Sequence, residues 1–207
     1  MKKNVKKVIL TVLSVALIVA LSVTATLAWL QDTTKTVTNT FAVGDINIDL
    51  VETVGGTSQF AATADVTNDG FKIVPGAVES KDPKVIVEAN SEDSFVFVKV
   101  EESNVTVGGV TYVTYRIAEG WEPLVDTNND GIADDGVYYR EYTGDAKAEY
   151  PILTGNQVSY SKDLTKAQLE ALGTNKPSLK FTAYAIQKQG EGSAVFTAAD
   201  AWTVLNP

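Results

Sequence analysis

Two residue types are missing from this chain of 207 residues, which contains no cysteine and no histidine. Without cysteine the fold cannot rest on a disulfide framework. Without histidine the chain has no Ser-His-Asp or Cys-His catalysis, no HExxH zinc site and no histidine-containing facial triad. Most hydrolase mechanisms are therefore excluded.

Basic residues are scarce as well, with 17 Lys and Arg against 26 Asp and Glu. Four of the lysines lie in the first seven residues, and they precede the apolar run "VILTVLSVALIVALSV". A short basic head followed by an apolar run is typical of an export signal. The sequence therefore predicts that the chain leaves the cytosol.

Small residues stand at the positions that a signal peptidase requires before two bonds, after Ala25 and after Ala28. We favour cleavage between Ala28 and Trp29, which makes residues 1–28 a helical signal peptide and starts the secreted protein at Trp29 or within a few residues of it. The alternative is an uncleaved anchor, because residues 8–30 can cross a hydrocarbon core of about 30 Å.

Removal of residues 1–28 leaves 179 residues, which fits one domain. Because the removed part holds four lysines and no acid, the remainder has 13 basic and 26 acidic residues and a net charge of −13. This charge argues against nucleic acid and anionic membranes as partners. It suits a soluble exported protein and the binding of divalent cations.

Past the signal, apolar and polar residues alternate as they do in β-strands. Phe41 to Leu50 alternate with a change of phase at Gly44, and further strands are expected in residues 84–89, 95–100, 110–118, 137–142 and 180–187. Two short helices are expected in residues 164–173 and 196–205, where Thr165 and Thr197 precede capping partners three residues later. We predict an all-β fold, an antiparallel β-sandwich with two short helices that cover an end of it, formed by residues 29–207 as a single domain.

The stretch "DTNNDGIADDG", residues 126–136, has the spacing of a calcium loop. Oxygen ligands at alternating positions, a glycine and a backbone carbonyl follow the first nine positions of an EF-hand-type loop. The candidate ligands are Asp126, Asn128, Asp130, the carbonyl of Ile132, and Asp134 or Asp135. The twelfth position is Val137 rather than the usual Glu, so the alternative is a solvated turn whose Asn, Asp and Gly suit tight backbone geometry.

A set of short motifs in a fixed order resembles the TasA/camelysin family of exported Gram-positive proteins. The N-terminal part of the set comprises Ala28-Trp29, Asp32-Thr33, Asn39-Thr40-Phe41 and Gly44. The later part comprises Lys72 to Gly76, Lys81-Asp82-Pro83, Phe97 to Val100, Val137 to Arg140 and Ala183 to Gln187. The resemblance spans nearly the whole chain.

The resemblance implies a secreted, non-enzymatic protein with a jelly-roll sandwich that assembles into biofilm-matrix or cell-surface fibres. It implies processing by a SipW-type signal peptidase and association with itself and with other matrix proteins. Camelysins are also classed as metallopeptidases, but this chain lacks the histidines that zinc peptidases use to activate water.

Residues 29–43 are a candidate donor strand, because residues 31–43 are rich in β-formers and contain no proline. Such a strand, released by cleavage, can pair with the next subunit; the alternative is a leader that stays flexible or pairs within its own subunit. Two other functions use the same fold: a monomeric Ca²⁺-dependent surface adhesin and a camelysin-like metallopeptidase. Trp121, Tyr138 and Tyr139 are a candidate carbohydrate-stacking face, although aromatics in strands usually belong to the core.

Overall fold

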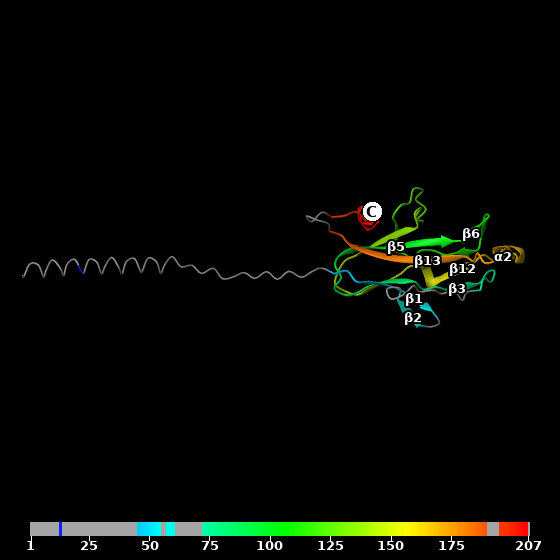
Figure 1. Cartoon of the computed structure of the whole chain (residues 1–207), viewed down its shortest axis with the longest axis horizontal. Coiled ribbons are helices and arrows are strands. Elements are labelled where there is room, and N and C mark those ends of the chain that lie inside the picture. Colours follow the sequence, from blue (N-terminus) through cyan, green and yellow to red (C-terminus); the bar gives the residue numbers. More distant parts are fainter. Residues whose placement is uncertain (1–12, 14–44, 55–56, 61–71, 190–194, 207) are drawn as a thin grey trace, which may run out of the picture. The chain divides into compact units, whose positions relative to one another are not determined.

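The structure is a computed structural model that describes residues 45–54, 57–60, 72–189 and 195–206, together with residue 13. Apart from residue 13, the predicted signal peptide, the cleavage pair Ala28–Trp29 and the candidate donor segment lie outside these ranges. Among the helices within the ranges, none is both long and apolar enough to cross a membrane. The elements described below all belong to one compact unit (Figure 1).

The first sheet has four antiparallel strands in the order β11-β4-β1-β2. The strands are β1 (Ile48–Val54), β2 (Thr57–Phe60), β4 (Lys84–Val87) and β11 (Ala148–Pro151). Val85 of β4 stands opposite Leu50 on one side and Tyr150 on the other. Val85 and Val87 are fully buried, so β4 is the centre of this sheet.

The second sheet is also antiparallel, in the order β13-β5-β10-β9. The strands are β5 (Ser94–Ser103), β9 (Glu122–Pro123), β10 (Val137–Tyr142) and β13 (Ser178–Gln187). β5 pairs with β13 from Ser94 to Ser103, and with β10 on its other side. This sheet therefore has β5 in its interior and the ten-residue β13 at one edge.

Smaller β elements lie between the main strands along the chain. A three-stranded sheet has the order β3-β12-β8, and β6 and β7 form a hairpin. Their bounds are β3 (Val78–Ser80), β6 (Thr106–Val107), β7 (Val110–Thr111), β8 (Val113–Thr114) and β12 (Gln157–Tyr160). A short 3-10 helix, η1 (Thr154–Asn156), leads into β12.

The two four-stranded sheets share one apolar core. Side chains alternate between the faces of a strand, so Val96 and Val98 of β5 join Val85 and Val87 of β4 in one cluster. Each of these valines is fully buried, which contributes about 1.5–3 kcal/mol per side chain. The predicted all-β fold, with antiparallel sheets and two short helices, is confirmed.

The C-terminal helix α3 (Ala198–Leu205) covers the other face of the second sheet. Phe97, on the opposite face of β5 from Val96 and Val98, is fully buried there. The ring centre of Trp202 lies 5.2 Å from that of Phe97 and 5.3 Å from that of Tyr184. We expected this helix to cover an end of the fold. It packs on a face instead, because Phe97 and Tyr184 present aromatic surface that Trp202 covers.

The other helix, α2 (Lys166–Leu172), begins and ends as its sequence predicts. Thr165 and Gln168 form a reciprocal capping box, and Gly173 follows the last turn with a positive φ of 53°. Leu172 is buried and Leu169 half-buried against the shared core. Thr197 and Asp200 form the same capping box at the start of α3.

Candidate functional site

The acidic loop between β9 and β10 turns its side chains onto its own backbone. Asp126 accepts hydrogen bonds from the N–H groups of Asp130 (3.2 Å) and Gly131 (2.9 Å). Asn128 Oδ1 also accepts from Asp130 N at 3.1 Å, and Asp130 Oδ1 accepts from Ile132 N at 2.8 Å. The structure therefore brings together three of the predicted ligands, Asp126, Asn128 and Asp130.

The last two predicted ligands have other partners. Asp134 Oδ2 accepts from the backbone N–H (2.9 Å) and the hydroxyl (2.7 Å) of Thr127, and these bonds lower the pKa of Asp134. Asp135 Oδ1 accepts from Val137 N at 2.9 Å, at the start of β10. Ile132, whose carbonyl is the remaining candidate ligand, has a side chain that is 62% exposed.

One glycine and one tyrosine fix the base of this loop. Gly136 has a φ of 72°, and a Cβ there would lie 2.5 Å from the carbonyl oxygen of Val100, so the position requires glycine. The hydroxyl of the buried Tyr138 accepts from Ala133 N at 3.1 Å. The loop is thus tied to β5 and β10 whether or not an ion is bound.

The described residues contain no group of three or more acidic, histidine or cysteine side chains arranged to hold a metal ion. Each carboxylate offers about four lone-pair sites, so a single backbone bond leaves capacity for a cation. The donor set, all oxygen, suits Ca²⁺ rather than zinc. Calcium binding by Asp126, Asn128 and Asp130 stays a prediction, and the turn geometry accounts for the loop without it.

A second candidate site is the outer edge of β13. Among the described strands, none pairs with that edge. β1 of the first sheet passes close to β13 but takes its hydrogen-bonded partners from β2 and β4. The edge residues Phe181 to Ile186 are half-buried and include no charge and no proline.

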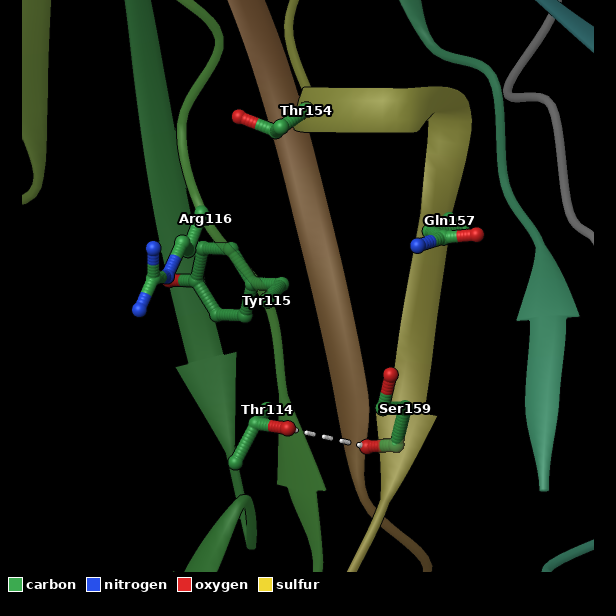
Figure 2. A pocket seen from close by; sticks show the side chains of 6 residues that line it. All are labelled: Thr114, Tyr115, Arg116, Thr154, Gln157 and Ser159. Carbon is green, nitrogen blue, oxygen red and sulfur yellow. Dashed lines mark hydrogen bonds between the residues drawn. The ribbon is translucent and has the colours of Figure 1, made fainter. Parts of the chain in front are cut away.

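A third feature, a polar hollow, was not predicted from the sequence. Figure 2 shows it between the chain that follows β8 and the segment η1–β12. Its lining residues are Thr114, Tyr115, Arg116, Thr154, Gln157 and Ser159, and its volume is about 540 Å³. The two walls are some 40 residues apart in the chain, so only their pairing in the fold reveals the hollow.

The aromatic residues that the sequence offered as a stacking face are part of the fold. Trp121 and Tyr138 are buried, and Trp121 Nε1 donates to the carbonyl of Pro151 at 2.8 Å. Tyr139 lies in the other apolar cluster, and its hydroxyl donates to Glu122 at 2.7 Å. The stacking-face hypothesis is therefore wrong for this trio.

Comparison of the chain with protein-family models, with curated proteins and with solved structures finds no match.

Proposed function

We propose that this chain is a secreted structural protein, a subunit of extracellular-matrix or cell-surface fibres that assembles by strand donation. In this proposal residues 1–28 are removed by a SipW-type signal peptidase, and residues 29–207 form one domain, a jelly-roll-type sandwich. Residues 29–43 then pair with the next copy of the chain. The protein is not an enzyme in this scheme, and other matrix proteins are additional partners.

The observation that carries the proposal is the contrast between β13 and the other sheet edges. Exposed strand edges attract further strands, and proteins usually blunt them with short length, charge or proline. β9 has two residues and ends in Pro123, β11 has four and ends in Pro151, and β2 has only four. β13 has ten residues, and its segment 181–187 carries neither charge nor proline.

The length of the candidate donor matches this edge. A strand rises about 3.3 Å per residue, so the ten residues of β13 need a partner of about 33 Å. The thirteen residues 31–43 span about 43 Å when extended, which covers β13 with residues to spare. Strand addition of this kind obtains its affinity from main-chain hydrogen bonds. Because it joins unlike surfaces, it grows a filament unless it closes into a ring.

Deletion of residues 29–40 from the mature protein tests the proposal. We expect the truncated protein to fold with an unchanged melting temperature, to stay monomeric, and to form no filaments in negative-stain images. A peptide of residues 29–43 added in trans should shorten the filaments of the full mature protein. Filaments from the truncated protein, equal in number and length, would contradict the mechanism. A melting temperature lowered by the deletion would show that the segment pairs within its own subunit.

The same preparations test the expectation that the protein is not an enzyme. A camelysin-like peptidase would cleave casein in a chelator-sensitive reaction, and we expect no such cleavage.

A further inference from the structure

We propose that the hollow between β8 and β12 binds a carboxylate-bearing sugar, such as a uronic acid unit of an acidic polysaccharide, with Arg116 recognising the carboxylate and Tyr115 supplying the aromatic face. This site is independent of strand donation and goes beyond the proposed role in fibres.

The hollow is held open by pairing at both of its ends. At one end Ser159 stands opposite Thr114, and Thr114 Oγ1 donates to the Ser159 carbonyl at 3.3 Å. At the other end Ile117 bridges Leu153, and Thr154 Oγ1 donates to the Ile117 carbonyl at 2.9 Å. Between these ends no ladder joins Tyr115 to the segment 155–158. The two walls are therefore fixed in place before any ligand arrives, which lowers the cost of binding.

The lining favours a polyhydroxylated ligand. Five of the six lining side chains are Thr, Ser, Gln or Tyr, which carry both donors and acceptors, and none is aliphatic. Gln157, Thr114 and Thr154 are exposed within this opening. An apolar ligand would bury these groups without partners, and that is costly. Sugar hydroxyls, which donate and accept alike, can satisfy them.

Tyr115 is one of the residues that line the hollow (Figure 2), and it is half-buried against the shared core. Its hydroxyl donates to the carboxylate of Glu102 on β5. Burial and this acidic partner raise the pKa of Tyr115, and the hydrogen bond to Glu102 holds the polar end of the ring. A tyrosine ring with its polar end already bonded presents apolar surface to the flat C–H face of a sugar.

Arg116 gives the hollow its charge preference. It is one of only two arginines in the chain, and the other, Arg140, stacks 3.8 Å above the ring of Tyr150. Arg116 is exposed and forms no ion pair with any described residue, although acids outnumber bases in the sequence. A guanidinium can form two parallel hydrogen bonds with one carboxylate, a bidentate pair. A single exposed cation is too little positive charge for a polyanionic nucleic acid.

The test is titration of the mature protein with tetragalacturonic acid, followed by calorimetry at 150 mM salt with excess chelator to remove calcium bridging. The methyl-esterified tetrasaccharide and galacturonic acid itself are the comparison probes. Arg116→Gln removes the charge, and Lys176→Gln removes another exposed cation, from the loop after α2. Gln157→Ala removes a neutral lining group.

We expect Arg116→Gln to weaken binding of the acid at least about tenfold, the effect of one charge-assisted pair, while Lys176→Gln leaves it unchanged. The ester should bind the original protein as weakly as the acid binds Arg116→Gln, and Gln157→Ala should weaken both probes. Galacturonic acid should compete for the site, because the proposed contacts are made to one uronic acid unit. Equal binding of acid and ester, equal loss in Lys176→Gln, or no binding of the tetrasaccharide by the folded protein would each overturn the proposal.

Discussion

Single residues in the acidic loop set its backbone before any ion is considered. Asn129 and Gly131 have φ values of 58° and 81°, in the left-handed region that Asn and Gly tolerate best. Asp126 and Asn128 accept from the N–H groups that this turn exposes. Each bond of this kind contributes about 1 kcal/mol net, so the loop is ordered by its own short side chains.

Thr127 controls the acidity of Asp134. Its hydroxyl and its backbone N–H both donate to the carboxylate, and both lower the pKa of Asp134. A depressed pKa in the folded state means that the stabilisation is present above the unfolded pKa and is lost as the pH falls through the folded pKa. Thr127→Val keeps the N–H bond and removes the hydroxyl, so we expect the pKa of Asp134 to rise part of the way to its ordinary value.

Carboxyl-carbon NMR titration of Asp134 measures this shift. Thr174→Val, an exposed threonine in the loop after α2, is the matched control and should leave the pKa of Asp134 unchanged. An unaltered titration of Asp134 in Thr127→Val would show that the hydroxyl bond does not persist in solution.

Calcium binding is also a property that single residues of this loop determine. Without a closing Glu at position 137 we expect an affinity of about 10⁻⁴ to 10⁻³ M. An ion bound only by the folded state stabilises it by RT ln(1 + [L]/Kd), about 1.4 kcal/mol at tenfold excess over Kd. Asp130→Ala should abolish the rise in melting temperature that millimolar Ca²⁺ causes, whereas Asp163→Ala, an exposed acid outside the loop, should keep it. Identical melting in Ca²⁺ and in chelator would leave the turn as the whole role of this loop.

At the scale of elements, the parts that the sequence predicts well are those that depend on neighbours in the chain. Both capping boxes join residues three apart, so Thr165 and Thr197 mark their helices correctly. Strands with strong alternation, β5, β10 and β13, lie where expected. Residues 110–118 were predicted as one strand but form β7, β8 and a bridge at Ile117, because they pair in turn with β6, β12 and Leu153.

Lys81 connects the two main sheets through one side chain. Its ammonium lies 2.8 Å from Glu52 Oε1 of β1 and 5.5 Å from the ring centre of Phe181 on β13. The side chains of Lys81 and Glu52 are only 11% and 12% exposed. The neighbouring Asp82 accepts from the backbone N–H (2.9 Å) and hydroxyl (2.8 Å) of Thr53. The Lys81-Asp82 pair thus fixes β1 against the segment that joins β3 to β4.

Lys81→Met should therefore destabilise the protein by about 2–4 kcal/mol. The largely buried Glu52 would lose the ammonium of Lys81, while the free-energy cost of burying its carboxylate would remain. Lys84→Met is the matched control. Lys84 pairs with the half-exposed Glu149, so its loss should cost under about 1 kcal/mol. Urea unfolding measures both values. A loss for Lys81→Met no larger than that for Lys84→Met would mean that solvent screens the buried pair as well.

At the scale of the whole molecule, the edge of β13 and the surface charge have opposite effects on association between copies of the chain. The edge favours association, and the negative charge opposes it. The net charge of −9, or −13 after removal of the signal peptide, keeps separate copies apart in solution. The uncharged segment 181–187 leaves one short stretch where a strand can add without meeting that repulsion. The alternation in 180–187 predicts this strand, but its place at an edge follows from the order of strands in the sheet, which local patterns do not encode.

The assembly proposed for the whole molecule begins only if residues 29–43 are released from the membrane. A signal peptidase accepts a small residue before the cut, so Ala28→Tyr should block the bond to Trp29 and hold the precursor in the membrane fraction. Ala25→Tyr, which alters the other small residue, should be secreted normally. N-terminal sequencing of the secreted protein should give Trp29 as the first residue. If Ala28→Tyr is secreted at the normal level and secretion of Ala25→Tyr is lost, the cut lies after Ala25. A product that keeps Met1 would establish an anchor, and the free donor strand on which fibre growth depends would then not exist.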